Sequence, residues 1–117
     1  ELIRKNRAKF HACNLILIEG RAPDVLADLP APDAVFIGGT KGGMEAVLDE
    51  VLGKNPNARI CISAIALETL GAAIAALTAR GLTAEVTQIA VSRTKPAGRL
   101  HLLMANNPIF LITGTRK

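Results

Sequence analysis

The apolar residues of this chain follow two alternating patterns. Short segments rich in apolar residues at 14–19, 33–37 and 58–63 predict strands, and the unbroken run Leu15–Ile18 is typical of a strand that is buried on both faces of a sheet. Between these runs, apolar side chains recur every three or four residues, which predicts helices. The predicted helices cover residues 1–10, 22–29, 44–52 and 67–77, and two further strands are expected at residues 84–92 and 109–112. Gly53 and Gly81 are placed to end the last two helices.

This order of elements predicts one α/β domain over residues 1–117, built on a parallel sheet with helices on both faces. Because two strands follow one another at the end, one of them is expected to run antiparallel. The beginning is unusual, since a helix comes before the first strand and no strand is followed by a G-x-G-x-x-G turn. We therefore expect a first strand, its Gly-rich turn and a second strand upstream of Glu1, so that the domain is N-terminally truncated.

Composition narrows the functional classes. Half of the 117 residues are apolar, 21% are charged, and the formal net charge is +4. Phe10, Phe36 and Phe110 are the only aromatic residues, which is few for a protein that stacks nucleic-acid bases on aromatic side chains. Nucleic acid is therefore not favoured as a partner, and a modest positive charge suits small anionic ligands equally well.

The cysteines and the apolar runs give no indication of a metal site or a membrane anchor. Cys13 and Cys61 lie far apart and have no CxxC or Cys/His ligand spacing, so we expect two reduced packing thiols and no metal. The first residues are charged where a signal peptide needs an apolar run. The longest apolar stretch, residues 60–77, is interrupted by Glu68 and is too short to cross a bilayer. These features predict a cytoplasmic protein with no membrane partner.

Candidate binding segments follow the predicted strands. Ligands of open α/β sheets bind beyond the carboxyl ends of the parallel strands, and here those ends lead into residues 19–23, 38–43 and 63–69. The second segment has four glycines in six residues, which lets the backbone approach a ligand and present its N–H groups. An ordinary flexible turn between strand and helix is the alternative. Lys41 lacks the spacing of a P-loop.

Glu68 begins a predicted helix in an otherwise apolar neighbourhood. Its carboxylate either interacts favourably with the positive end of the helix dipole or points into a functional site. The sequence leaves both interpretations open.

The connection between the last two predicted strands is long and basic. It covers 16 residues, 92–107, whereas a hairpin loop usually has about 2–5 residues. Arg93, Lys95, Arg99 and His101 lie in it and suit a ligand with several carboxylates, which arginine binds bidentately. A solvated basic surface loop is the alternative. Because no Ser/His/Asp or Cys/His arrangement accompanies His101, nucleophilic catalysis gets no support.

Three segments resemble the decarboxylating precorrin methyltransferases. They are residues 33–40 (DAVFIGGT), residues 64–69 (AIALET), and a block that runs from residues 91–95 (VSRTK) to residues 107–114 (NPIFLITG). The last block is highly specific, and the similarity extends in order over essentially the whole chain. The family comprises the C-terminal domain of precorrin-6Y (5,15)-methyltransferase and the stand-alone cobalt-precorrin-6B methyltransferase that acts at carbon 15.

The resemblance implies a fold, a cofactor and a reaction. The fold is the Rossmann-like class I methyltransferase fold, with strand order 3-2-1-4-5-7-6 and strand 7 antiparallel. The cofactor is S-adenosylmethionine, and the substrate is a corrin precursor of the precorrin-6B or cobalt-precorrin-6B type that carries acetate and propionate arms. The implied reaction methylates a meso carbon and removes carbon dioxide from the ring C acetate, in cobalamin biosynthesis. Family members are commonly homotetramers, so a homo-oligomer is expected.

The resemblance also implies roles for individual residues. The cofactor-binding residues that it implies are Gly20, Arg21, Ala22, Pro23, Gly38 and Gly39. The first four match a loop that borders the adenine, and the family varies at Arg21. The substrate-binding residues that it implies are Thr40, Arg93, Lys95 and Arg99, and the expected catalytic residues are Glu68, which matches the family's acidic residue after the fifth strand, and His101.

The sequence also departs from the family pattern. The Gly-rich turn that cradles the methionine and the acidic residue that holds the ribose are both absent, so we expect weak cofactor binding by this chain alone. It either borrows strands by swapping or oligomerisation, or belongs to a longer chain.

Two other functions stay open: a small-molecule or RNA methyltransferase of the same fold, and a non-catalytic assembly module that has lost its cofactor half.

Overall fold

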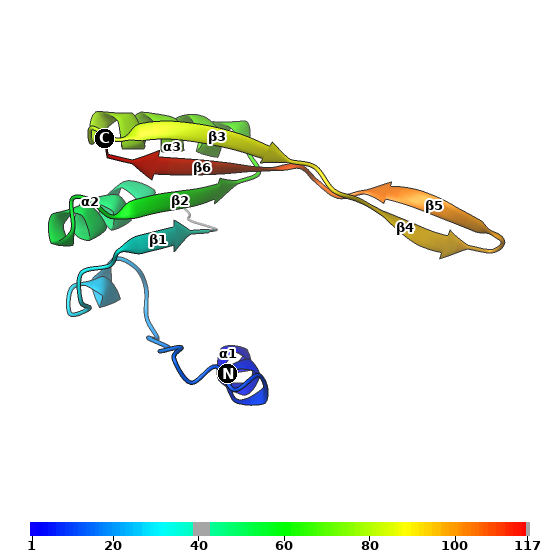
Figure 1. The fold of residues 1–117 in the computed structure, drawn as a ribbon, viewed down its shortest axis with the longest axis horizontal. Coiled ribbons are helices and arrows are strands. Elements are labelled where there is room, and N and C mark those ends of the chain that lie inside the picture. The colour runs from blue at the N-terminus through cyan, green and yellow to red at the C-terminus, as the bar shows by residue number, and fades with distance from the viewer. Residues whose placement is uncertain (39–42, 117) are drawn as a thin grey trace.

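The computed structural model describes residues 1–38 and 43–116. Four strands form one sheet in the order β1-β2-β6-β3, and two more form a separate ribbon (Figure 1). The elements are, in chain order, α1 (Leu2–Lys9), the 3-10 helix η1 (Asp24–Leu26), β1 (Ala34–Ile37), α2 (Met44–Lys54), β2 (Arg59–Ala64), α3 (Leu67–Ala79), β3 (Thr83–Ile89), β4 (Ser92–Ala97), β5 (Leu100–Ala105) and β6 (Ile109–Thr115).

Strand β6 lies in the middle of the sheet and runs against its neighbours. β1 and β2 are parallel, whereas β6 is antiparallel to both β2 and β3. In register, Ile62 of β2 faces Ile112 of β6, which in turn faces Val86 of β3. The expectation of an antiparallel strand near the end of the chain is confirmed, and that strand is the last one.

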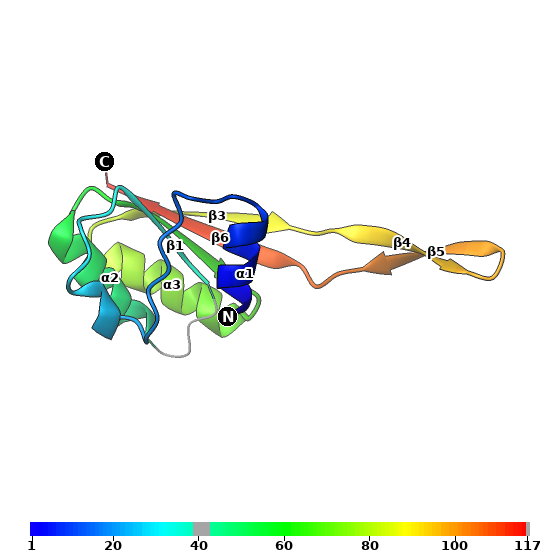
Figure 2. The ribbon, with the colours of Figure 1, turned by 90° about the horizontal axis from the view of Figure 1, so that it is seen from below.

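Helices α2 and α3 cover one face of the sheet (Figures 1 and 2). Buried and more exposed residues therefore alternate along β2. Ile60 and Ile62 are buried under the helices, whereas Arg59 on the other face is exposed. The prediction of helices on both faces is wrong for the described residues, since none of their helices covers the opposite face. Phe36 consequently stays 66% exposed although it lies in an unbroken apolar run.

The N-terminal third forms less regular structure than the sequence predicts. Helix α1 lies beyond the β1 edge of the sheet (Figure 1). Residues 14–19, predicted as a buried strand, form no strand, because no described strand lies beside them to complete a ladder. Instead, Arg4 pairs with Glu19 at 2.8 Å. The helix predicted at residues 22–29 shortens to η1, and α2 continues through Gly53 to Lys54 instead of ending at the glycine.

The predicted basic loop is an extended β-hairpin. β4 and β5 pair in register from Ser92 opposite Ala105 to Ala97 opposite Leu100. A two-residue turn connects them, and Gly98 there has a φ of 62°, which suits a tight hairpin turn. We call residues 92–105 the arm. It extends away from the sheet along the long axis of the molecule, which measures 57 Å (Figure 2), and residues 85–108 are all exposed.

Within residues 1–38 and 43–116, no helix is both long and apolar enough to cross a membrane.

Candidate functional site

The carboxyl ends of β1 and β2 meet at one edge of the sheet. A cavity of about 440 Å³ opens there between β1, β2, α3 and β6. Its lining residues are Phe36, Ser63, Ala64, Ile65, Thr69, Ile109 and Leu111. Gly38 follows β1 so closely that a Cβ atom on it would lie 3.4 Å from Ser63 Oγ. The strand ends therefore form one contiguous surface, which we call the carboxyl-edge site.

A larger apolar cleft of about 810 Å³ lies along the outer edge of β1. Its walls are β1 and α2 on one side and the segment before β1 on the other, with Ile16 and Ala22 among the lining residues. Gly38 also lines this cleft, and Phe36 lines both the cleft and the carboxyl-edge cavity. Two of the residues predicted to bind cofactor, Ala22 and Gly38, are thus brought to one place.

The loop at residues 20–23 has a conformation that its glycine permits. Gly20 has a φ of 140°, and a Cβ atom on it would lie only 2.1 Å from Val25 Cγ1. The next turn closes when the backbone N–H of Val25 donates to the carbonyl of Arg21 at 3.3 Å. Side chains larger than hydrogen do not fit at residue 20, so the course of this loop past the cleft depends on the glycine.

Lys54, at the end of α2, binds the segment that follows this loop. Its ammonium group donates hydrogen bonds to the carbonyl oxygens of Leu26, Ala27 and Leu29, the second at 2.9 Å. These carbonyls lie at the end of η1 and in the turn after it, where the Leu26 carbonyl also accepts the backbone N–H of Leu29 at 3.1 Å. One side chain therefore caps η1 and fixes the wall of the cleft against α2.

The two predicted catalytic residues lie on different elements. Glu68 is exposed in the first turn of α3 and lines a shallow groove between α2 and α3, together with Glu45. His101 lies in β5 opposite Pro96, near the tip of the arm. Among the described residues no hydrogen bond or ion pair joins them, so this chain alone does not assemble them into one site. Gly39 and Thr40 lie outside the described residues.

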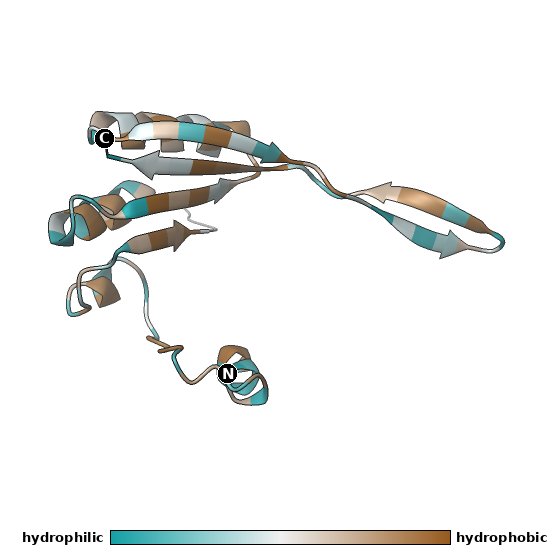
Figure 3. Ribbon diagram, viewed as in Figure 1, coloured by the Kyte–Doolittle hydropathy of each residue, from teal (hydrophilic) through white to brown (hydrophobic). Residues whose placement is uncertain are grey.

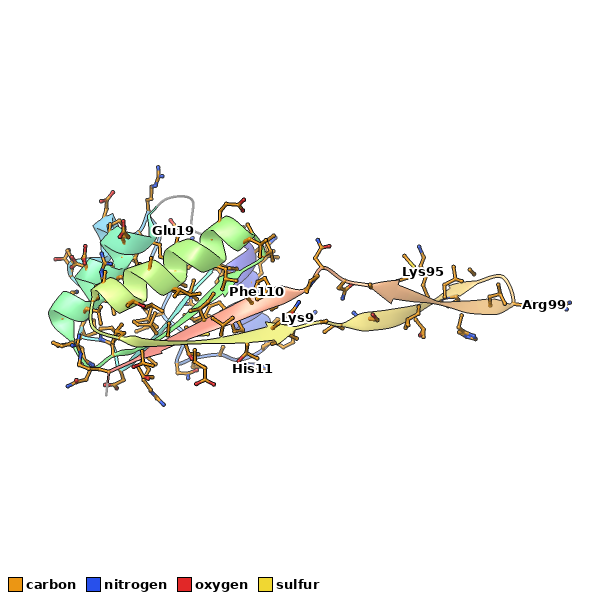
Figure 4. All side chains as sticks on the ribbon, turned by 90° about the horizontal axis from the view of Figure 1, so that it is seen from above. Lys9, His11, Glu19, Lys95, Arg99 and Phe110 are labelled. Carbon is orange, nitrogen blue, oxygen red and sulfur yellow. The ribbon has the colours of Figure 1, made fainter. Side chains whose placement is uncertain are left out.

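The predicted carboxylate-binding residues are spread along the arm (Figure 4). The arm begins at the carboxyl edge, since β3 ends there and β6 begins there. Arg93 is near this base, Lys95 is further out, and Arg99 is in the turn at the tip. Six residues of strand span about 20 Å, so Arg93 and Arg99 cannot both reach the carboxyl-edge site of their own chain.

Sequence reasoning missed the hydroxyls that line the carboxyl-edge cavity. Ser63 is the penultimate residue of β2, and Thr69 lies in the first turn of α3. Both fall inside the predicted segment 63–69, but only Glu68 was singled out from it. The signal for both hydroxyls in the sequence is their position just before and just after the carboxyl end of a strand.

Arg80 forms ion pairs that hold helices α2 and α3 together. Arg80 Nε donates to Asp49 Oδ1 at 2.8 Å, and its NH1 lies 3.6 Å from Glu45 Oε1. This bond joins the end of α3 to α2, and the hydrogen bond from Arg80 lowers the pKa of Asp49 below its usual value of 3.8. Among the described residues, no three His, Cys, Asp or Glu side chains gather as metal ligands would.

Residues 1–116 match the model of the precorrin methyltransferase domain family. The chain belongs to this family. It is 39% identical over 115 residues to a probable cobalt-precorrin-6B C(15)-methyltransferase (decarboxylating) from Pyrobaculum calidifontis, covering 96% of this chain and 58% of that protein. The family resemblance seen in the sequence is thereby confirmed.

Solved structures agree with this assignment. A precorrin-6y C5,15-methyltransferase from Geobacter metallireducens superposes with a TM-score of 0.90 at 38% identity, covering 98% of this chain and 60% of that one. An S-adenosylmethionine-dependent O-methyltransferase from Thermotoga maritima superposes with a TM-score of 0.71 at 15% identity, covering 96% and 43%. The α/β methyltransferase fold expected from the sequence is confirmed, and the chain spans about 60% of the length of its precorrin relatives.

Proposed function

We propose that this chain serves the S-adenosylmethionine-dependent methylation of a corrin precursor of the precorrin-6B or cobalt-precorrin-6B type. Methylation is coupled to loss of carbon dioxide from the acetate on ring C, as a step of cobalamin biosynthesis in the cytoplasm. The observation that carries the proposal is the family match over residues 1–116, which includes both the carboxyl-edge site and the arm.

The described residues fit the apolar part of the cofactor. The cleft along β1 is apolar, and its volume of about 810 Å³ lies in the usual range of ligand pockets, about 300–1,000 Å³. Its charged lining residues are Glu50 and Lys54, and Lys54 is already engaged by three carbonyls. The described lining therefore suits an adenosyl group and offers no free cation for the methionine carboxylate.

S-adenosylmethionine, when bound, supplies a methyl group activated by its sulfonium. The chain's own residues then hold the two reactants. Gly20, Arg21, Ala22 and Pro23 border the adenine, and Gly38 and Gly39 allow the backbone to approach the methionine part. Aligning two reactants and excluding water can contribute on the order of 7–11 kcal/mol to lowering a barrier, so this positioning is the main task of the fold.

The cationic arm binds the carboxylate-bearing substrate. Arg93, Lys95 and Arg99 are exposed and free to contact acetate and propionate groups, and Thr40, which lies outside the described residues, is proposed to contact the substrate as well. Carboxylates attract guanidinium groups in bidentate pairs, so the arm sets which carbon of the ring faces the methyl donor. Glu68 and His101 stay predictions as catalytic residues.

A homo-oligomer, tetrameric as in the family, is part of this proposal. Residues 85–108 are exposed and carry large apolar side chains that a single chain leaves in water. Burying such surface stabilises an assembly by about 25 cal/mol per Å², which favours association.

The experiment is a turnover assay on the protein at the length at which the cell makes it. It is incubated with S-adenosylmethionine and a precorrin-6B-type substrate, and the product is measured by mass spectrometry. A gain of one methyl group with loss of carbon dioxide is expected. Tight cofactor binding without turnover of corrin precursors would indicate another acceptor, and failure to bind cofactor in calorimetric titration would indicate a non-catalytic module.

A further inference from the structure

The carboxyl-edge cavity and the arm differ in charge. The large residues that line the cavity are apolar, and its polar side chains are two hydroxyls: Phe36, Ile65, Ile109 and Leu111, with Ser63 and Thr69. Among the described residues, no lysine, arginine or histidine lines it. Figure 3 shows β1, β2 and the beginning of β6 as mainly hydrophobic and β4 as mainly hydrophilic. A carboxylate in the cavity would therefore meet neutral groups, whereas a carboxylate on the arm would meet cations.

The described charges around the cavity do not offset this neutrality. Arg93, at the base of the arm, is not among the residues that line it. Thr69 lines both the cavity and the adjoining groove between α2 and α3, whose charged lining residues are Glu45 and Glu68. The N-terminus of α3 favours an anion, but Glu68 in its first turn already offsets the helix dipole. These surroundings therefore stabilise a bound carboxylate poorly.

Poor stabilisation of a carboxylate promotes the loss of carbon dioxide. Removing an ionised carboxylate from water is costly unless a cation or hydrogen bonds replace its hydration. Carbon dioxide is neutral, so an apolar cavity raises the free energy of the reactant more than that of the separating products. The arm has the opposite effect, because Arg93, Lys95 and Arg99 stabilise any carboxylate that they bind.

Ser63 and Thr69 can hold the carboxylate without adding a charge. Both side chains are half-buried, and within the part of the chain that the structure describes no hydrogen bond engages either hydroxyl. Hydrogen bonds that the hydroxyls donate to a carboxylate favour its ionised form, and only the ionised form loses carbon dioxide directly. The two hydroxyls thus orient the carboxylate while leaving it less stable than a cation would.

The position of the cavity suits ring C of the proposed substrate. Phe36 lines both the cavity and the cleft that suits the adenosyl group, so the two spaces adjoin. In a tetrapyrrole, carbon 15 is bonded to ring C. An acceptor that presents carbon 15 to the cleft therefore brings ring C to the adjoining cavity, whose volume of about 440 Å³ lies in the usual range of ligand pockets.

We propose that the carboxyl-edge cavity is a decarboxylation pocket, which takes the ring C acetate against Ser63 and Thr69 while the arm holds the carboxylates that remain. The carbon–carbon bond between the acetate methylene and its carboxylate breaks, and carbon dioxide leaves. The electron pair passes into the conjugated macrocycle, and a proton from water then converts the methylene group into a methyl group. This inference rests on the proposed function and adds which residues select the acetate that is lost.

A cation placed in the cavity tests the pocket. Ile65 lines the cavity, is 71% exposed and lies between β2 and α3, so Ile65→Lys adds an ammonium group outside the core. In the protein at the length at which the cell makes it, this variant should bind a precorrin-6B-type substrate about tenfold more tightly, because one charge-assisted hydrogen bond is gained. Calorimetric titration of the substrate without cofactor measures this affinity.

The same variant should decarboxylate less. Because the ammonium group stabilises the carboxylate, the carbon dioxide released per methyl group transferred should fall about tenfold. Mass spectrometry measures this ratio, since a methylated product that keeps its acetate carboxylate differs in mass from the decarboxylated one. Tighter binding together with less decarboxylation is not a result that an unfolded variant could give. Weaker binding, or an unchanged ratio, would overturn the pocket.

Two further variants separate charge from position and from bulk. Leu67→Lys is the matched control, because Leu67 is 70% exposed but does not line the cavity, and both substrate affinity and the product ratio should stay unchanged. Ile65→Met gives a side chain of similar length without a charge, so it should lower the ratio far less than Ile65→Lys. Equal losses in Ile65→Lys and in either of these variants would contradict an electrostatic effect inside the cavity.

Removing the two hydroxyls gives an independent test. The double variant Ser63→Ala, Thr69→Val should bind the substrate more weakly and release less carbon dioxide per methyl group, because the carboxylate is no longer held in its ionised form. Both kinds of variant thus lower the product ratio but shift substrate affinity in opposite directions. A product ratio that the double variant leaves unchanged would show that the hydroxyls do not hold the acetate.

The unsubstituted protein distinguishes the two levels of the proposal. If it methylates no corrin precursor, the proposed function and the pocket both fail. If it methylates and decarboxylates normally, and Ile65→Lys and the double variant do so in the same ratio, the pocket alone fails.

Discussion

Gly114 of β6 lies so close beneath Leu77 of α3 that a Cβ atom on the glycine would come within 2.8 Å of the leucine Cδ2. Leu77 is completely buried, and α3 contacts the sheet at this point. The glycine thus sets how closely α3 packs on the strand that separates β2 from β3.

Replacing this glycine should destabilise the fold. Gly114→Ala adds a methyl group where the core has no space, and overpacking of this kind typically costs about 1–3 kcal/mol. Urea unfolding followed by circular dichroism measures the loss. Gly71→Ala in α3 is the matched control, because an added Cβ there has no neighbour within 4 Å in the described structure. The control should stabilise the helix by about 1 kcal/mol, and equal destabilisation by both changes would contradict the packing argument.

Lys54→Met should loosen the wall of the cleft. The change removes the hydrogen bonds to Leu26, Ala27 and Leu29 and keeps most of the side-chain volume. Hydrogen bonds to charged groups contribute about 1.5–3 kcal/mol, so amide hydrogens near η1 should exchange faster by at least tenfold. Hydrogen exchange read by mass spectrometry tests this, with α3 as the internal reference. Unchanged protection of residues 21–32 would show that the lysine does not hold them.

The bond between Arg80 and Asp49 predicts a pH dependence. Because the pKa of Asp49 is lowered in the folded state, its contribution to stability is present above the unfolded value of 3.8 and is lost as pH falls through the folded pKa. Asp49→Asn should therefore lower the urea midpoint at neutral pH and flatten its fall in acid. Glu50→Gln on the same helix is the control, and an unaltered acid profile in Asp49→Asn would contradict this assignment.

In the complete protein, Arg93→Ala should weaken substrate capture and leave cofactor affinity nearly unchanged. Loss of one charge-assisted contact predicts about a tenfold rise in the KM for a carboxylate-bearing corrin precursor. Arg59→Ala, at the opposite end of β2, removes the same charge far from the carboxyl edge and should change neither constant. Calorimetric titration with S-adenosylmethionine separates the two affinities, and equal loss of both would argue against a role in substrate binding.

Local pattern predicted most of the elements. The helical spacing from Met44 and from Leu67 corresponds to α2 and α3, and the apolar runs at residues 33–37 and 58–63 correspond to β1 and β2. These predictions are correct because the spacing of apolar residues within each element defines the face that it buries. The antiparallel last strand was also predicted, since two strands in succession leave no crossover helix.

The predictions from sequence fail where the secondary structure of a segment depends on a neighbouring strand. Residues 14–19 are as apolar as β1, but a strand forms only where another backbone completes its hydrogen bonds. The arm was not predicted, because in this case a neighbouring strand is present and makes an irregular-looking segment pair. Residues 92–97 have no apolar alternation, and they become β4 because β5 pairs with them across the turn at Gly98.

The sequence by itself determined the family, the α/β order and the positions of the strand ends, because these follow from local spacing and from a specific motif. Only the tertiary structure decided which of the candidate residues meet. It brought Ala22 and Gly38 to one cleft and placed Thr69 beside Ser63 at the carboxyl edge. It also placed Arg99 at the tip of the arm, far from the carboxyl edge. The distance between them is set by backbone pairing of six residues in β4 with six in β5, and no side-chain pattern in the sequence indicates this pairing.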